Sequence, residues 1–182
     1  HPQASRTIIL NAHNCHPFQA NDDVSGIVAG ILIAREWSQH LDVDLNLRLI
    51  IAPEIYGPLF YLNETKNENF FGAILLKAIG NRNKLKLQSS LGEVSEIDRI
   101  FSKTLQDHNI EFSTHAFRSF YGNDEIVFEN PPFCIPSITL TRIPFSEYHT
   151  SSDTPEIISE TLIKEVVEVT VNVLEGISIN NK

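Results

Sequence analysis

Histidine and aspartate residues are concentrated in one short segment, HNCHPFQANDDVSG, which runs from His13 to Gly26. Its two histidines are three positions apart, and two adjacent aspartates follow before an apolar stretch begins. Imidazole nitrogens and carboxylate oxygens are ligands that zinc prefers where one coordination position stays open for water. The residues by themselves leave two interpretations open, which are a polar turn and part of a metal site.

Further polar residues follow other apolar runs of the chain. Glu54 lies in IIAPEIYG, and His149 lies in EYHTSSD. The candidate zinc ligands are therefore His13, His16, Asp22 and His149. A carboxylate that binds no metal can act as general base toward a bound water, and Glu54 is the candidate for that role. Each residue also has an ordinary explanation, because Asp22 can cap a helix and a histidine at a strand end is often exposed.

Alternating strands and helices must position these residues. Apolar and β-branched runs predict strands over residues 6–12, 45–53, 70–79 and 134–143, with two shorter strands in KLKLQSS and EFSTHAF. Helices are predicted from Asp22, after Gly57, over 93–108 and from Pro155, and Gly26 and Gly30 should let the first helix pack closely on a sheet. This alternation is typical of an α/β layered sheet, in which sites form at the carboxyl ends of strands. Because the polar residues follow those ends, we expect them to converge on one rim.

Bulk composition limits the classes of function. The chain has 182 residues, which suits a single domain over residues 1–182, and 42% of them are hydrophobic while 20% are charged. Its net charge of -9 leaves no basic footprint for nucleic acid or an anionic membrane, and no apolar run reaches the roughly 18 residues of a membrane span. Two cysteines and no signal-peptide pattern favour a cytoplasmic location. Because the chain contains no methionine, we expect an upstream segment to be missing.

Four strings, HNCHPFQANDDVSG, APEIYGPLFYL, FYGNDE and EYHTSSDTPE, resemble in this order the co-catalytic zinc aminopeptidase superfamily. That superfamily includes the bacterial leucyl aminopeptidases and the glutaminyl cyclases, and the pattern is most similar to a bacterial aminopeptidase-like group with Cys-His-Pro, Pro-Glu-x-x-Gly and Glu-Tyr-His-Thr-Ser steps. The resemblance implies a three-layer α/β sandwich, in which helices flank a central mixed, mostly parallel sheet. It also implies a zinc-dependent hydrolase of the aminopeptidase type that acts on peptides or amino-acid amides.

The resemblance assigns roles to the candidate metal and catalytic residues. It implies that Asp22 is the bridging aspartate at the head of the first helix and that His149 is the last histidine ligand. His13 takes the position of the first histidine ligand, with His16 as its rival. Glu54 takes the place of the general base, three residues before a glycine.

The resemblance also implies a substrate-binding side of the site. Asp124 and Glu125 match a polar pair that lines the substrate pocket in related enzymes, and one of them would anchor a free α-amino group. Independently of the resemblance, Tyr148 flanks His149, and two interpretations stay open for it, which are a substrate contact and a packed aromatic residue. Related catalytic domains usually carry more chain before the first strand, so we expect an exposed sheet edge, with a homo-oligomer or a missing N-terminal segment to cover it.

Three positions depart from the implied pattern. Ile55 stands where a metal-binding glutamate is expected, and Asn81 stands where a carboxylate ligand follows the third strand. Cys15 replaces an aspartate that orients the first histidine, and its alternatives are a thiolate ligand and the buried structural residue that we expect. The number of zinc ions, one or two, therefore stays open. Two alternatives to hydrolysis stay open as well, which are a binding or structural domain without turnover and a single-zinc acyl transfer of the glutaminyl cyclase type.

Overall fold

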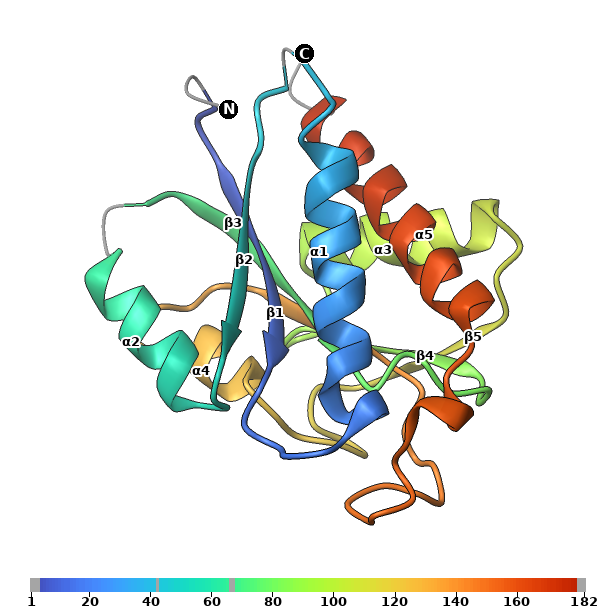
Figure 1. Cartoon of the computed structure of the whole chain (residues 1–182). Helices are drawn as coiled ribbons and strands as arrows, with labels where there is room; N and C mark the ends of the chain where they lie inside the picture. Colours follow the sequence, from blue (N-terminus) through green and yellow to red (C-terminus); the bar gives the residue numbers. More distant parts are fainter. Residues whose placement is uncertain (1–3, 42, 66–67, 180–182) are drawn as a thin grey trace.

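A single mixed sheet organises the chain in the computed structural model, which describes residues 4–41, 43–65 and 68–179 (Figure 1). In this part of the chain six strands follow the order β2-β1-β3-β6-β4-β5. Four strands run parallel, namely β1 (Thr7–His13), β2 (Asn46–Ala52), β3 (Phe70–Lys77) and β6 (Ser137–Thr141). The shorter strands β4 (Leu85–Gln88) and β5 (Phe112–His115) are parallel to each other and antiparallel to β6. The predicted α/β class with a mixed, mostly parallel sheet is confirmed.

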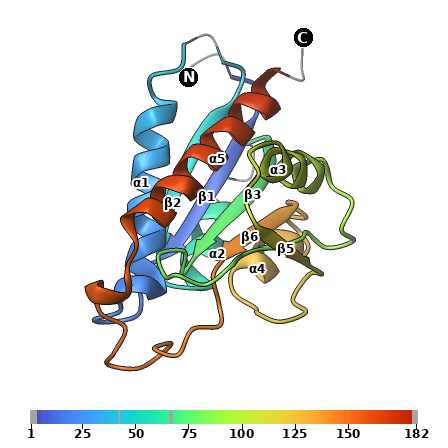
Figure 2. The same cartoon turned by 90° about the vertical axis from the view of Figure 1, so that its right-hand side faces the viewer.

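Helices cover both faces of this sheet (Figures 1 and 2). One face carries α1 (Ser25–Trp37), α3 (Glu96–Asp107) and α5 (Glu160–Ile179), and the other carries α2 (Tyr56–Glu64) and α4 (Glu125–Glu129). Successive residues of β1 point to opposite faces, so Ile8 and Leu10 enter the larger core under α1, α3 and α5, while Ile9 enters the smaller core under α2 and α4. Both faces of the central strands are therefore buried, which explains why their sequences are continuous apolar runs.

Two glycines of α1 allow this helix to lie close to the sheet, as predicted. A Cβ atom on Gly26 would overlap the carbonyl oxygen of Leu76 in β3, and one on Gly30 would lie 2.7 Å from Leu49 Cδ1 of β2. The overlap at Gly26 is with backbone, which cannot move aside as a side chain can. The start of α1 is thereby held against the carboxyl end of β3.

We expect the Gly26→Ala substitution to lower the free energy of unfolding by about 1–3 kcal/mol, because the added methyl group overpacks the helix–sheet contact. Gly176→Ala in α5 is the matched control, since a Cβ atom there meets only Ile100 Cγ2 at an ordinary 3.6 Å. The control should leave stability unchanged or raise it by up to about 1 kcal/mol. Denaturant unfolding of both variants makes the comparison, and equal stabilities would contradict the close approach at Gly26.

Several boundaries differ from the predictions. The first helix is preceded by a kinked π-helical turn, Ala20–Val24, because Asp22 and Asp23 have non-helical backbone angles. The final helix begins at Glu160, since a separate 3-10 turn, Pro155–Ile157, ends before it. The five-residue helix α4 was not predicted, because it is too short to show a periodic pattern. Cys134, the first residue of the strand predicted over 134–143, is outside the strand and exposed, because β6 begins only at Ser137.

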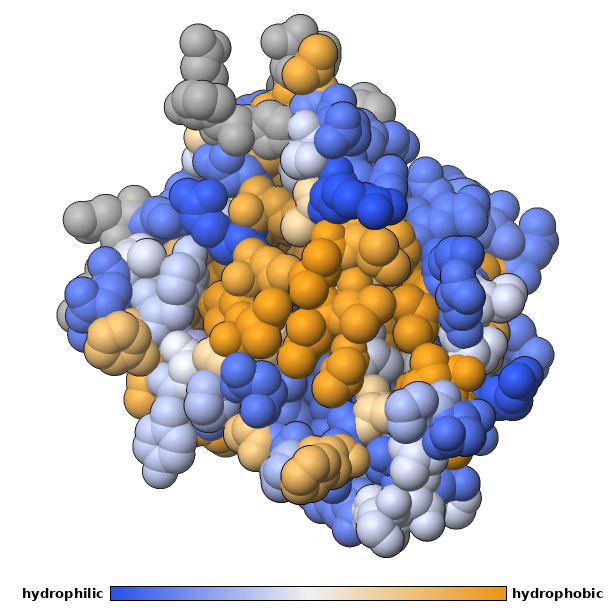
Figure 3. All heavy atoms as spheres, in the orientation of Figure 1, coloured by the Kyte–Doolittle hydropathy of each residue, from blue (hydrophilic) through white to orange (hydrophobic). Residues whose placement is uncertain are grey.

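An apolar surface lies over α1 and the neighbouring edge strand β2 (Figure 3). Exposed large apolar residues of this region include Val28 and Ile31 of α1 and Ile51 of β2. An exposed sheet edge of the expected kind is therefore present at β2, while oligomerisation through it stays a prediction. In the part of the chain that the structure describes, no helix combines the length and apolarity needed to cross a membrane.

Candidate metal and catalytic site

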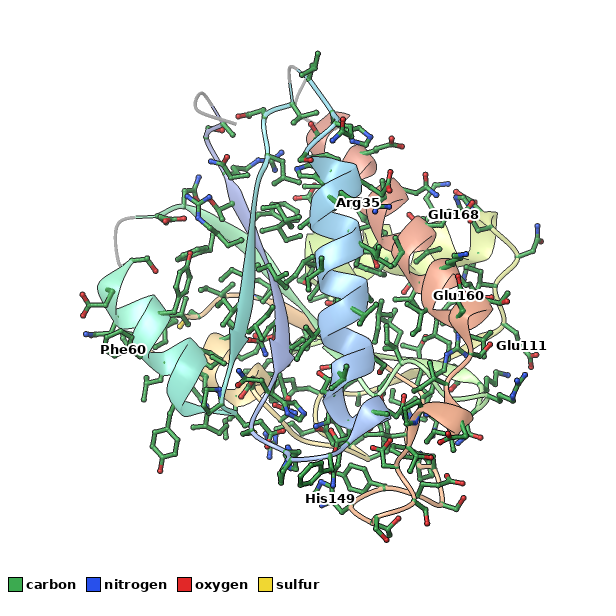
Figure 4. All side chains as sticks on the ribbon, in the orientation of Figure 1. Arg35, Phe60, Glu111, His149, Glu160 and Glu168 are labelled. Atoms are coloured by element: carbon green, nitrogen blue, oxygen red, sulfur yellow. The ribbon has the colours of Figure 1, made fainter. Side chains whose placement is uncertain are left out.

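The carboxyl ends of the parallel strands bring the candidate residues together. His13 is the last residue of β1, and Glu54 follows β2 by two residues. Asp22 lies in the turn that leads into α1, and His149 lies in the segment between β6 and α5. Figure 4 shows His149 at this end of the molecule, close to the start of α1. The expected convergence of distant polar clusters on one rim is therefore what the geometry shows.

The side chains of the two residues that flank Asp22 hold its turn in place through hydrogen bonds. Asn21 Oδ1 accepts a hydrogen bond from the backbone N–H of Gly80, and Asp23 Oδ1 accepts one from Ala78, with donor–acceptor distances of 2.8 and 2.9 Å. The buried carboxylate of Asp153 accepts hydrogen bonds from the backbone N–H groups of Asn21 (2.7 Å) and Asp22 (3.0 Å). Burial raises the pKa of Asp23 to about 7, although nearby His13 and Lys77 act in the opposite direction. These bonds leave the side chain of Asp22 directed into the site.

We expect Asp153→Asn to lower the free energy of unfolding by about 1.5–3 kcal/mol. Each oxygen of the carboxylate accepts a hydrogen bond from a backbone N–H group. The NH2 group of asparagine can only donate, so one of these two bonds would be lost. The exposed Asp107, which pairs with Lys103 on α3, provides the control, and Asp107→Asn should change stability by less than about 1 kcal/mol. Thermal or denaturant unfolding measures both. Equal effects would show that Asp153 does not hold the turn.

Asp22 lies at the centre of the site, and its two carboxylate oxygens face different partners. Oδ1 is 3.0 Å from His13 Nε2 and 2.5 Å from Lys77 Nζ, whereas Oδ2 is 3.1 Å from His149 Nε2. Burial alone would raise the pKa of Asp22. The hydrogen bond with His13 and the charge of Lys77 outweigh burial and hold this pKa well below its usual range. Asp22 is therefore an ionised carboxylate with cationic or imidazole neighbours on both sides.

Three histidines surround this carboxylate. The ring of His16 lies 4.8 Å from that of His13 and 4.9 Å from that of His149. Ligand atoms of His16, Asp22 and His149 all lie within 4.8 Å of one another. Such a set of imidazole and carboxylate donors fits a zinc ion. The structure thus brings both histidines of the HNCH segment to the site.

Cys15 is exposed, so the prediction of a buried structural cysteine is wrong. It lies on the connection between β1 and α1, outside the packed core. Its Sγ atom is 3.6 Å from His13 Nδ1 and 3.4 Å from His16 Nδ1. His13, Cys15, His16 and Glu54 form a second group whose ligand atoms lie within 4.8 Å of one another.

Glu54 is held beside the histidines by several donors. Its Oε1 atom accepts hydrogen bonds from Asn123 Nδ2 at 2.5 Å and from Lys77 Nζ at 3.2 Å, and it lies 3.4 Å from His13 Nε2. Burial would raise the pKa of Glu54, but the charges of Lys77 and His13 outweigh it, so the pKa is lowered. The next residue, Ile55, has a left-handed φ of 64°, which is rare for a β-branched side chain and typical of functional turns.

Lys77 is a site residue that the sequence analysis missed. The position expected after the third strand was Asn81, but the Asn81 side chain donates to the carbonyl oxygens of Ala78 and Arg142 and takes no part in the cluster. Strand β3 ends earlier than predicted, and its last residue is Lys77. Asn11 pairs with Leu75, so Lys77 lies beside His13, two residues further along each strand. A charged residue closing the apolar run FFGAILLK was the signal available in the sequence.

The residues predicted to bind substrate lie near the site, and two of them already accept hydrogen bonds from other groups of the protein. Buried Asp124 accepts hydrogen bonds from Asn11 Nδ2 and from the Ile55 N–H, each at 2.6 Å. Buried Glu125 accepts one from Arg118 at 2.8 Å, and burial raises the pKa of both carboxyl groups. These contacts favour a positioning role, and substrate binding by Asp124 and Glu125 stays a prediction.

Tyr148 is half-buried and stacks on the ring of His149, with 3.8 Å between ring centroids. This contact orients the histidine, which has a left-handed φ of 58° and an exposed side chain. A contact between Tyr148 and substrate stays a prediction.

The chain is similar in sequence or fold to several known proteins. A curated Clostridium acetobutylicum protein, named as a candidate "polysaccharide biosynthesis protein with aminopeptidase-like domain", is 31% identical over 150 residues, which are 80% of this chain and 34% of that protein. A crystal structure of a peptidase candidate from the same organism superposes with a TM-score of 0.88 at 23% identity, over 96% of this chain and 42% of that one. A zinc aminopeptidase from Bacillus subtilis superposes with a TM-score of 0.80 at 17% identity, over 94% and 46% of the two chains.

The fold is therefore that of an aminopeptidase-like α/β domain, as the sequence motifs predicted. The chain belongs to the family described as "Domain of unknown function (DUF4910)", which it matches over residues 1–180. It spans about a third of the length of the curated relative and less than half of the two solved chains.

Proposed function

We propose that this chain is a zinc-dependent hydrolase of the aminopeptidase type, which cleaves peptides or amino-acid amides. One observation carries the proposal, namely that donor atoms of His16, Asp22 and His149 lie within 4.8 Å of one another, beside the carboxylate of Glu54. The likeness to zinc aminopeptidases in fold is a second support. The donors come from two segments that are far apart in the chain, and Glu54 comes from a third, so a polar turn alone would not explain their convergence.

The proposal divides the chemistry between the metal and the chain's own residues. A bound zinc ion supplies Lewis acidity, which polarises a substrate carbonyl and makes water easier to deprotonate. Glu54 takes a proton from the attacking water and returns it to the leaving amine. All the Glu54 contacts described above reach Oε1, so Oε2 is the oxygen that we assign to proton transfer. Asn123 and Lys77 hold the carboxylate in place, and the charges of Lys77 and His13 lower its pKa.

A paired assay tests the proposal. Zinc per chain is measured by elemental analysis on protein purified without chelator or affinity metal, after zinc supplementation. The same protein is then given a panel of amino-acid amides and their N-acetylated counterparts. We expect bound zinc, cleavage of the free amides and little cleavage of the acetylated ones.

Other outcomes lead to the alternatives. Bound zinc with no cleavage of either substrate set would contradict hydrolysis and favour a binding domain without turnover. Pyroglutamate formation from a peptide with N-terminal glutamine would instead indicate acyl transfer of the cyclase type. Protein that binds no zinc even after supplementation would remove the basis of the proposal.

A further inference from the structure

The ammonium group of Lys77 is surrounded by atoms that could bind a metal ion. Its Nζ atom is 2.5 Å from Asp22 Oδ1 and 3.2 Å from Glu54 Oε1, and it also contacts His13 Nε2. The ring of Tyr121 is 5.6 Å from Nζ on another side. The Lys77 side chain is 2% exposed, so the charge is enclosed by these partners.

These contacts matter because a buried ammonium group and a metal ion compete for the same atoms. One imidazole nitrogen and two carboxylate oxygens would suit zinc, yet each of them is in contact with Lys77. The lysine also compensates the negative charge of Asp22 and Glu54, whose burial without a partner would be costly. Lys77 therefore already supplies a positive charge on the side of Asp22 that faces His13.

Different groups face the other carboxylate oxygen of Asp22. Oδ2 faces His149, and His16 lies within reach of both residues. The side chain of His149 is 48% exposed, so this position is open to solvent and to a ligand. Lys77 contacts Oδ1, so the two sides of the carboxylate are chemically distinct.

We infer that Lys77 is a fixed cation in place of a second metal ion, and that the protein binds a single metal at His16, Asp22 and His149. This inference rests on the proposed function and decides between the two histidines of the HNCH segment. His16 is then the ligand, whereas His13 is a partner of the lysine. Lys77 is a positioning residue, because it acts through Asp22 and Glu54.

Metal stoichiometry tests the inference directly. Wild-type protein is titrated with Zn²⁺ by calorimetry and with Co²⁺ by visible spectroscopy, neither of which depends on turnover. We expect one equivalent per chain. His149→Ala should lose this equivalent, whereas His13→Ala should retain it with an affinity within about tenfold of wild type. Two equivalents in wild type would overturn the inference but leave the proposed function intact, and no bound metal would overturn both.

Removal of the lysine charge is the complementary experiment. Lys77→Met and Lys77→Asp vacate the position beside His13, and we expect at least one of these variants to bind a second equivalent of Zn²⁺. Lys103→Met, which changes an exposed lysine of α3, should keep one equivalent. If both Lys77 variants fold, as judged by circular dichroism, and still bind one equivalent with unchanged affinity, the inference is wrong. If neither folds, the wild-type stoichiometry and the histidine pair still decide it.

Discussion

Glu54→Gln is expected to lower kcat by about 10²–10⁴-fold while leaving bound zinc unchanged, because general-base catalysis contributes roughly that factor. Glutamine has the same shape, and its carbonyl oxygen can still accept the hydrogen bonds from Asn123 and Lys77 that reach Glu54 Oε1. The ability to take a proton is lost, together with the negative charge that faces Lys77. The change therefore separates the chemistry of the residue from its place in the network, and steady-state kinetics on an amino-acid amide measures it.

The control for this substitution is Glu64→Gln, at the exposed end of α2. It makes the same change of charge in the helix that follows Glu54, and we expect kcat to remain within about twofold of wild type, as is usual for a surface position. Elemental analysis of both variants checks that metal content is equal. A Glu54→Gln variant that kept more than a tenth of wild-type kcat would show that another group accepts the proton.

Asp22→Asn is expected to abolish the thermal stabilisation that zinc gives the wild-type protein. Zinc at about 100 times its Kd should add about 2.7 kcal/mol to the free energy of unfolding. For a domain of this size that corresponds to a rise in Tm of roughly 5–10 °C. Asp22 faces His149 through Oδ2 and Lys77 through Oδ1, so an amide at this position weakens the metal site and leaves Lys77 with less compensation. Melting curves with zinc and with excess chelator measure the difference.

The same melting curves contain their own control. The chelator should lower the Tm of zinc-loaded wild type to that of the metal-free protein and have no effect on Asp22→Asn. Asp107→Asn on α3, which lies outside the site, should respond to zinc as wild type does. A zinc-dependent shift that survived in Asp22→Asn would place the metal elsewhere.

The sequence predicted the fold class and most elements because the central strands are long apolar runs and α3 has a regular apolar face. The interior of β1 is buried on both sides, and Ile97, Phe101 and Leu105 of α3 face the core at helical spacing. The direction of β4 and β5 could not be predicted, because strand polarity depends on pairing with distant segments. Nothing in KLKLQSS distinguishes a parallel from an antiparallel neighbour.

The sequence predicted which residues gather at this end of the sheet but missed some of their neighbours. Placing the end of the third strand at residue 79 rather than at Lys77 moved the expected site position to Asn81 and concealed the lysine. Asp153 is a second example, because its carboxylate accepts hydrogen bonds from the turn before α1. That role depends on the contact of two segments more than a hundred residues apart, which a local pattern cannot reveal.

The order of strands in the sheet also has a consequence for how the chain folds. β3 is central, and its neighbours come from distant parts of the chain, since Thr7 pairs with Phe70 and Ala73 pairs with Ser137. Closing such long loops before the parallel pairs can form makes folding slow. During synthesis, β1 and β2 both emerge before β3, so the inner edge of β1 stays unpaired until β3 follows. We expect this interval to be the time at which the nascent chain is most prone to aggregation.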